Sequence, residues 1–505
     1  MATDVDVESA PPAYRELLDQ YRRASVIGST QELLSWDQQT MMPPGGTGAR
    51  SPQQSTLSGL THELITDESV ASWLDDLDGA DLREGQAATV REIRRQHERA
   101  TAIPRELVEA LSRKGTEAFS VWEQARADAD FSQFAPTLEE LVELRREYAA
   151  AIDPDRDPYA VLFEDYEPYL PLETADRVLT RFREALVPLV DAVADSDVTI
   201  ESPFAGRTYA DADQEALSRA VLDVLDYDWD RGRLDVSTHP FTAGNQFDCR
   251  ITTRFMADDP YDNLESTIHE FGHATYNLGL PLDAFGTPLG ESRDLTVHES
   301  QSRFWENHVG RTRAFWDVLA PLVRDRFGGL DDVSPETFYR GMNEVYADNF
   351  IRTYADELTY HLHIVVRYEI ERDLVSGDLD VADVPQVWND KMEDYLGIRP
   401  ENDAQGCLQD VHWSHANFGY FPTYSLGSVL AAQFDHALRT DVDDVDAKIR
   451  AGDVGPLHDW LGEHVHRYGC RYTTPDLVER ATGEAYTADH FVDYVTEKYG
   501  ALYDL

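Results

Sequence analysis

The sequence predicts a mostly α-helical protein with one small β-sheet. Two observations support this class: apolar residues recur at helical spacing over most of the 505 residues, and residues 233–255 alternate as strands do. No tandem repeat and no long linker rich in Gly, Ser or Pro divides the chain. We therefore expect one large domain of residues 1–505, with two lobes around a groove.

The predicted helices follow one another along the chain. The first covers residues 12–40, where Leu17, Tyr21 and Ala24 fall near the helical period, and it ends at the turn MMPPGG, residues 41–46. Further helical stretches are predicted over residues 83–152 with a break at Pro104, 173–196, 212–226, 315–326, 335–375 and 455–466.

The small sheet is predicted over about residues 198–255. Residues 233–255, RLDVSTHPFTAGNQFDCRITTRF, are rich in Thr and Phe and contain a GN turn, which indicates an antiparallel hairpin. VTIESPF at 198–204 is a candidate third strand. The sheet precedes a helix that should begin at Asp259-Pro260 and end at Gly279.

The chain is strongly acidic. It carries 95 acidic and 44 basic residues, a net charge of -51, and only four of the basic residues are lysines, namely Lys114, Lys391, Lys448 and Lys498. Such a surface repels phosphate backbones and anionic membranes, so we expect neither nucleic acid nor membrane as a partner. At molar salt the Debye length falls to about 3 Å and self-repulsion is screened. Scarce lysine with abundant acid favours a halophilic protein over an acidic protein adapted to ordinary salt.

The cysteines and the N-terminal residues predict where in the cell the protein is found. Cys249, Cys407 and Cys470 form no CxxC pair, and MATDVDVESAPPAYRELLDQ at residues 1–20 has neither a basic start nor an apolar stretch. No run of eighteen apolar residues occurs either. We expect a cytoplasmic protein without a secretory signal.

Residues 269–273 read HEFGH, the pattern with the most definite chemistry in the chain. Positions i and i+4 of a helix lie about 40° apart around its axis, so His269 and His273 can bind one metal ion. Glu270 then lies beside the ion, where its carboxylate can take a proton from water. A helix with two ordinary histidines is the alternative that this motif alone leaves open.

A zinc site of this kind needs a third protein ligand and an open position for water. A second helix is predicted over residues 295–310, LTVHESQSRFWENHVG, and its Glu299 lies 26 residues after His273, a suitable distance for a helix that returns to the same ion. Nearby serines and acids elsewhere are weaker candidates, and His298 is the rival ligand. Longer HExxH sites place a third His six residues on, where this chain has Gly279. The expected ligand set is His269, His273 and Glu299.

Further polar residues are grouped in short sequence segments, and each group can be explained either by a role in function or by a role in structure. They are His239 in HPF at 239–241, Arg250 in DCRIT at 248–252, Arg352, Asp356 and Tyr360 on one predicted helical face of 351–361, and Gln409, Asp410, His412, Trp413, Tyr420 and Tyr424 within 406–427. The structural explanations are a turn histidine, a surface ion pair and an aromatic core segment.

Six of these motifs together carry a family resemblance. They are HPF at 239–241, DCRIT at 248–252, HEFGH at 269–273, HESQ at 298–301, IRTYAD at 351–356 and GCLQDVHW at 406–413, in this order. With them the chain resembles the carboxypeptidase Taq family of metallocarboxypeptidases. The resemblance extends to SWDQQTMMP at 35–43, PRELVEALS at 104–112 and FGYFPTYSLG at 418–427, and so covers nearly the whole chain.

The resemblance implies a mostly helical fold with a long groove, a small sheet along it, a divalent metal at its floor, and a homodimer. It also implies that single residues are removed from peptide C-termini with broad preference. His269, His273 and Glu299 would hold the metal, and Glu270 would be the general base. Two His and one Glu favour zinc, with cobalt or manganese as alternatives.

A carboxypeptidase needs two further kinds of residue: a donor that stabilises the oxyanion and a group that binds the C-terminal carboxylate. The tetrahedral oxyanion needs a donor besides the metal, and Tyr420, Tyr424 and His412 are the candidates.

A free C-terminal carboxylate is best bound by a bidentate arginine, for which we expect Arg352 first and Arg250 second. His239 is expected to line the same subsite, unless the HPF turn is purely structural.

Two other functions are weighed against carboxypeptidase activity. A zinc oligopeptidase with a helical groove would share the metal site but cut inside short peptides. A binding protein that keeps the metal helix without turnover would not require Glu270, so the intact HExxH motif argues against it.

Overall fold

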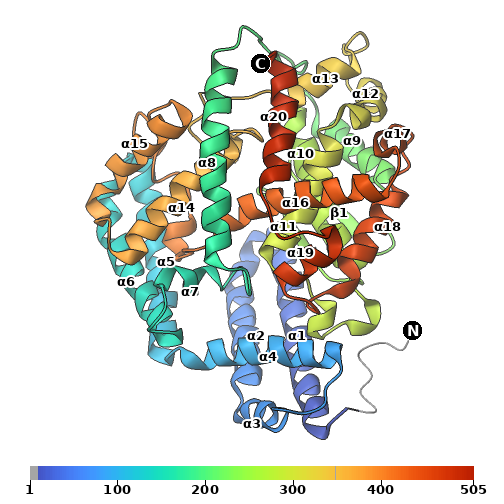
Figure 1. Cartoon of the computed structure of the whole chain (residues 1–505). Coiled ribbons are helices and arrows are strands. Elements are labelled where there is room, and N and C mark those ends of the chain that lie inside the picture. The colour runs from blue at the N-terminus through green and yellow to red at the C-terminus, as the bar shows by residue number, and fades with distance from the viewer. Residues whose placement is uncertain (1–9, 347) are drawn as a thin grey trace.

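The structure, a computed structural model, describes residues 10–346 and 348–505. Within these ranges the chain forms twenty α-helices and three short strands, which confirms the predicted mostly helical class (Figure 1). The helices are α1 (Pro12–Thr40), α2 (Thr47–Thr66), α3 (Glu68–Asp76), α4 (Glu84–Ala102), α5 (Arg105–Asp128), α6 (Ala135–Ile152), α7 (Pro158–Phe163), α8 (Leu172–Ala194), α9 (Asp211–Val224), α10 (Pro260–Gly279), α11 (Leu295–Arg303), α12 (Arg313–Arg326), α13 (Pro335–Met342), α14 (Tyr360–Ser376), α15 (Val384–Leu396), α16 (Pro422–Asp441), α17 (Val445–Arg450), α18 (Gly455–His464), α19 (Thr474–Thr482) and α20 (Asp489–Tyr503). The strands are β1 (Gly232–Val236), β2 (Thr242–Gly244) and β3 (Cys249–Thr253).

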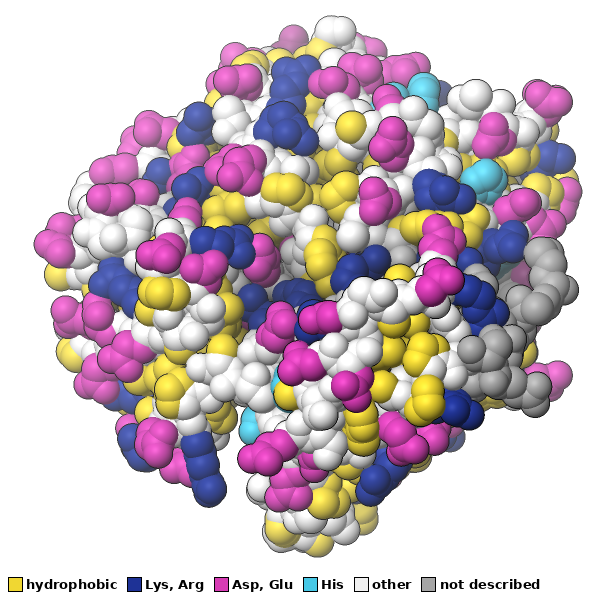
Figure 2. Space-filling model, turned by 60° about the horizontal axis from the view of Figure 1, so that its bottom comes forward, with side chains coloured by type: hydrophobic (Ala, Val, Ile, Leu, Met, Phe, Trp, Pro, Cys, Tyr) yellow, Lys and Arg dark blue, Asp and Glu magenta, His cyan; other side chains and the backbone are white. Residues whose placement is uncertain are grey.

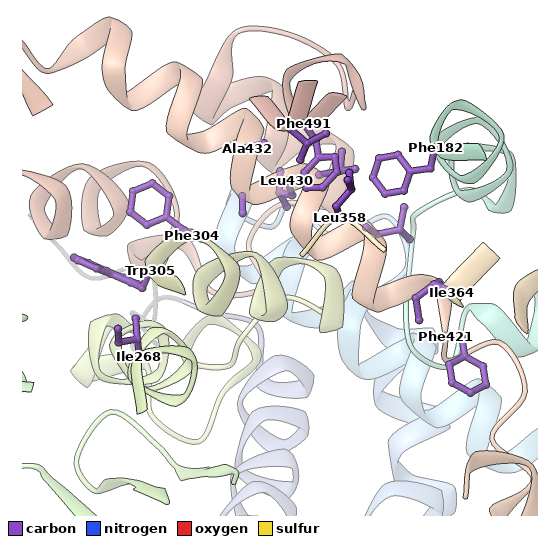
Figure 3. Packing of buried hydrophobic residues seen from close by; sticks show 14 of the residues in the cluster. Phe182, Ile268, Phe304, Trp305, Leu358, Ile364, Phe421, Leu430, Ala432 and Phe491 are labelled. Atoms are coloured by element: carbon purple, nitrogen blue, oxygen red, sulfur yellow. The ribbon is translucent and has the colours of Figure 1, made fainter. Parts of the chain in front are cut away.

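Two groups of helices have separate cores. Helices α1, α3 and α4 bury residues such as Leu18, Leu74 and Ile93 in a small cluster at the N-terminal end, drawn in blue at the bottom of Figure 1. Most other helices share one large core, in which Phe182 of α8 and Phe491 of α20 lie 4.9 Å apart between ring centroids. Figure 3 shows side chains from α8, α10, α16 and α20 that belong to this core.

Helix α10 begins and ends as its sequence predicts. The Asp259 side chain accepts a hydrogen bond from the Tyr261 backbone N–H, and Pro260 occupies the first helical position, where a missing N–H costs nothing. The helix ends at Gly279, and its apolar face buries Leu264, Ile268 and Phe271 in the large core.

Glycines let α10, α11 and α16 approach one another at backbone distance. A Cβ on Gly272 of α10 would lie 2.5 Å from the Gln301 carbonyl oxygen and 2.5 Å from Ser302 Cα of α11. A Cβ on Gly427 of α16 would lie 2.4 Å from Glu299 Cγ of α11. Helix α11 is thereby held between the other two.

The sheet lies next to α10 but differs from the predicted antiparallel one. Its order is β1-β3-β2, with β2 antiparallel and β1 parallel to β3. The GN turn does form the β2–β3 hairpin, whereas the chain passes from β1 to the far edge of the sheet before β3 fills the middle. Buried hydroxyls hold this crossover: Thr252 Oγ1 lies 2.8 Å from Ser237 Oγ and accepts the Phe241 N–H at 2.9 Å. Residues 198–204, the expected third strand, form irregular structure and a turn.

The helix predicted over residues 335–375 is two helices, α13 and α14. The described residues between them, 343–346 and 348–359, form turns, irregular segments and a 3₁₀ turn at Arg352–Tyr354. Asp356 stabilises this break, because its carboxylate accepts the N–H groups of Leu358 and Thr359 at 2.9 Å and that of Tyr346 at 3.0 Å. The prediction that Arg352, Asp356 and Tyr360 share one helical face is therefore wrong.

The helix predicted over residues 295–310 also changes character. It is α-helical as far as Arg303 and continues as a π-helix over Phe304–Gly310. The Arg311 N–H bonds the Glu306 carbonyl at 2.9 Å, five residues back, as in a π-helical turn.

We predict that Gly272→Ala lowers the free energy of unfolding by about 1–3 kcal/mol, because the new methyl group meets backbone atoms that cannot move aside. The matched control is Gly500→Ala in α20, where a Cβ meets nothing within 4 Å. Since alanine favours a helix interior, this control should gain about 0.5–1 kcal/mol. Chemical denaturation in molar KCl measures both, and equal stability of the two variants would contradict the close approach of α10 and α11.

Candidate active site

The HEFGH helix and α11 bring three potential metal ligands together. Ligand atoms of His269, His273 and Glu299 all lie within 4.8 Å of one another. Glu299 Oε2 lies 3.8 Å from His269 Nε2 and 3.5 Å from His273 Nε2. The two imidazoles project from one face of α10, as the i, i+4 spacing predicts.

The other ring nitrogens are already engaged. His269 Nδ1–H donates to Glu306 Oε2 at 2.8 Å, and His273 Nδ1–H donates to the His298 carbonyl at 3.1 Å. These bonds leave the Nε2 lone pairs directed to the space beside Glu299. Two imidazole nitrogens and one carboxylate oxygen, with ring tautomers fixed by outer hydrogen bonds, fit a divalent metal such as zinc.

The surroundings of the ligands are charged and buried. Arg303 Nε donates to Glu299 Oε1 at 2.8 Å, and Ser302 Oγ donates to Glu299 Oε2 at 3.3 Å. Burial lowers the pKa of His273 well below its usual range. Burial also acts to lower the pKa of His269, but Glu299 and Glu306 outweigh it and raise that pKa.

Glu270 is buried beside the edge strand of the sheet. Its Oε2 accepts a hydrogen bond from Thr242 Oγ1 of β2 at 2.6 Å. The same hydroxyl lies 2.9 Å from the Glu270 carbonyl oxygen, so β2 fixes both ends of this residue. Burial raises the pKa of the Glu270 carboxyl.

Arg352 is buried and already paired. Its Nε and Nη2 donate to Asp410 Oδ1 at 3.0 and 2.8 Å, and its Nη1 donates to the Tyr360 hydroxyl at 3.1 Å. Asp410 also accepts Arg367 Nε at 2.5 Å. Two arginines thus share one carboxylate, and together they hold the pKa of Asp410 far below its usual range despite burial.

Aromatic rings connect this arginine cluster with the metal-ligand cluster. Arg352 Cζ lies 5.3 Å from the Tyr424 ring centroid, and Tyr424 lies 5.2 Å from Tyr420. His412 lies 5.4 Å from Tyr420, and burial lowers the pKa of His412 to about 4. On the other side, Arg303 Cζ lies 5.2 Å from the Tyr360 ring centroid. Tyr420, Tyr424 and His412, predicted from one sequence segment, are therefore neighbours.

Arg250 and His239 lie apart from that cluster. Arg250 donates to Asp248 at 2.8 and 2.6 Å and stacks on Trp36 of α1, with Cζ 4.1 Å from the ring centroid. His239 is exposed. Over residues 10–346 and 348–505, neither side chain forms a hydrogen bond or ion pair with His269, His273 or Glu299.

The sequence analysis missed several residues that position the site. Arg303 and Glu306 lie at i+4 and i+7 from Glu299, a spacing that could have identified both. Glu371 of α14 gave no such signal: it anchors the segment 406–427 by accepting Trp413 Nε1 at 2.9 Å and the Gly419 N–H at 3.1 Å. Thr242 was likewise not singled out.

The molecular surface is hollowed. Figure 2 shows a deep hollow at the lower edge of this face, with histidine side chains on its walls. A cavity of about 360 Å³ lies between α1, the β2–β3 turn and the end of α10. Its wall includes Asn277, whose side-chain amide oxygen Oδ1 lies 3.2 Å from His298 Nε2. Among the described helices, none is long and apolar enough to cross a membrane.

Comparison with known proteins gives one consistent match. The family model of the carboxypeptidase Taq (M32) metallopeptidases matches residues 16–499. Thermostable carboxypeptidase 1 of Thermus thermophilus is 38% identical over 97% of this chain and 99% of its own. Thermostable carboxypeptidase 1 of Pyrococcus furiosus is 36% identical over 96% and 98%. The crystal structure of the M32 carboxypeptidase from Deinococcus radiodurans superposes with a TM-score of 0.94 at 39% identity, covering 98% of this chain and all of that one.

We predict that the protein binds one divalent metal per chain and that Glu299→Ala loses it, because two imidazoles alone bind weakly. The matched control is His298→Ala on the same helix. The His298 ring stacks on His273 at 4.5 Å, but its contact with His273 Nδ1 uses the backbone carbonyl, which the substitution keeps. Elemental analysis after dialysis gives the stoichiometry. Metal lost from His298→Ala but kept by Glu299→Ala would reverse the ligand assignment.

Proposed function

Because the chain belongs to the carboxypeptidase Taq (M32) metallopeptidase family, we propose that it removes single residues from peptide C-termini with broad preference. The observation that carries this proposal is the convergence of His269, His273 and Glu299 with Glu270 on the adjoining helical position. The chain is thus an enzyme that hydrolyses peptides, and the single-residue product is the part that we propose.

His269, His273 and Glu299 would hold the metal, for which we propose zinc, with cobalt or manganese as substitutes. When bound there, the ion would supply Lewis-acid chemistry, namely polarisation of the scissile carbonyl and a lower pKa for water. Glu270 accepts the proton of the attacking water and passes it to the leaving amine. Thr242, hydrogen-bonded to Glu270 Oε2, keeps the carboxylate aimed at that water.

The aromatic neighbours supply the oxyanion donor in this proposal. Tyr420 and Tyr424 present phenolic hydroxyls, and His412 presents a neutral imidazole because burial lowers its pKa to about 4. All three are partly accessible, and their rings are in mutual contact.

We assign Arg352 to the substrate carboxylate; Arg250, with His239 on the same β1–β3 segment, is the second candidate for this subsite. Arg352 and Arg367 share the single anion Asp410, so this buried trio carries a net positive charge. An uncompensated buried charge is costly, and a peptide carboxylate would neutralise it. Arg250, paired with Asp248, lacks this excess of positive charge.

We also propose a homodimer in the cytoplasm of a halophilic cell. All three cysteines are buried and free, as suits a reducing compartment. The acidic balance disfavours nucleic acid and anionic membranes as partners. The alternative activity, oligopeptidase cleavage inside short peptides, would use the same metal ligands and differ in its products.

The products decide between these activities. We expect a defined peptide, incubated in molar KCl with zinc or cobalt, to lose one C-terminal residue at a time, while its C-terminally amidated twin stays intact. Glu270→Gln should keep the metal and lose at least about 100-fold in turnover, because the general base is gone. Mass spectrometry reads the ladder, and internal fragments from both twins would establish an oligopeptidase instead.

The same pair of peptides tests the carboxylate assignment. Arg352→Ala should raise KM for the free acid far more than it raises the inhibition constant of the uncleaved amide, with Arg250→Ala as the comparison for the second candidate. A similar rise for both peptides would remove Arg352 from this role.

Salt dependence tests the halophilic proposal. The net charge of -51 predicts that far-UV circular dichroism and activity collapse below about 1 M KCl, where screening weakens. The measurement is a KCl titration with both readouts, and full activity in dilute buffer would refute this proposal.

A further inference from the structure

Glu306 contacts His269 at Nδ1, the ring nitrogen other than the Nε2 that faces Glu299. It belongs to the π-helical turn that follows α11 and is 6% exposed. Its Oε2 accepts His269 Nδ1–H at 2.8 Å, the shortest contact that this carboxylate makes among the described residues. A carboxylate in this position sets the tautomer and the orientation of the ring and increases the electron density on Nε2.

Two arginines contact Glu306 in turn, Arg311 buried and Arg303 partly buried. Arg303 Nη1 lies 3.1 Å from Glu306 Oε2, and Arg311 Nε lies 3.5 Å from Oε1. The carboxyl group of Glu306 is therefore held between two guanidinium groups and the imidazole of His269.

Arg303 makes a second contact that couples Glu306 to another ligand. Its Nε donates to Glu299 Oε1 at 2.8 Å, while its Nη1 contacts Glu306. One guanidinium thus holds a carboxylate of the ligand set and the carboxylate that orients an imidazole of that set. Arg311 extends the network to Glu265 of α10 through an Nη2–Oε1 contact of 2.7 Å.

We propose that Glu306 is a positioning residue for the metal centre and that it acts by orienting the His269 ring. Arg303, which contacts both Glu306 and Glu299, fixes the two carboxylates relative to each other. The inference rests on the proposed metal site. Orienting the ligands in this way increases the affinity for the metal. Glu306 therefore influences catalysis through His269 and Glu299 and does not contact the peptide.

The test measures metal affinity directly, by Zn²⁺ titration against a competing chelator. Glu306→Gln keeps an acceptor for Nδ1–H but loses the charge, and it should bind about 10-fold more weakly than wild type. Glu306→Ala loses both and should bind about 100-fold more weakly. The visible spectrum of the Co²⁺-loaded protein should change in both variants, since the ring orientation at the ion changes.

Glu265→Gln is the matched control. It replaces a carboxyl group of α10 one turn before His269 and also breaks a contact with Arg311, but in the described part of the chain its side chain makes no hydrogen bond or ion pair with His269. Its Zn²⁺ affinity should stay within about twofold of wild type, and thermal unfolding of the metal-free proteins verifies that each variant folds. If Glu306→Ala does not fold, the comparison of Glu306→Gln with Glu265→Gln decides.

Three outcomes are distinguishable. The inference is supported if Zn²⁺ affinity falls in Glu306→Gln but not in Glu265→Gln. Wild-type affinity in Glu306→Gln, or an equal loss in Glu265→Gln, overturns it, because the effect is then absent or does not depend on the contact with His269. A wild-type protein that binds no metal would instead refute the proposed function.

Discussion

The site depends on how closely three helices approach one another. Side chains of His and Glu are short, so three ligand atoms within 4.8 Å require backbones that nearly touch. Gly272 and Gly427 make this possible, because a Cβ at either position would lie 2.5 Å or less from atoms of α11. The motif HEFGH therefore combines two proposed metal ligands, the proposed base and the surface that contacts α11 in five residues. The glycine of that motif is as much a part of the geometry as its histidines.

The close packing buries charge, and arginine makes that burial tolerable. Arg303 joins Glu299 with Glu306, Arg311 joins Glu306 with Glu265, and two further arginines share Asp410. A planar guanidinium can bond two carboxylates at once, which a lysine ammonium does less well. The acid excess is spread over the surface in Figure 2, whereas these buried clusters pair their charges. Salt should therefore act mainly on the exterior of the molecule and less on the site.

Elements whose bounds depend on local sequence pattern could be predicted. Elements that depend on contacts between distant parts of the chain could not. Helix α1 matches its predicted bounds, and α10 begins at Asp259-Pro260 because a cap and a proline act locally. The parallel pairing of β1 with β3 was not predictable from alternation, since alternation is the same in both directions. The break before α14 depends on Asp356, whose carboxylate replaces helical hydrogen bonds with its own. A continuous helix was the natural expectation from apolar spacing alone.

The same division holds within the site. His269, His273 and Glu299 could be chosen from spacing because each lies on a helix with a regular period. Glu306 shares that period with Glu299, yet its role exists only because α10, 37 residues earlier, presents His269 Nδ1 to it. Thr242 and Glu371 have no periodic signal at all, since each acts across separate segments. Residues that supply chemistry are thus visible in sequence as motifs, whereas residues that hold them in place become visible only when the helices are packed together.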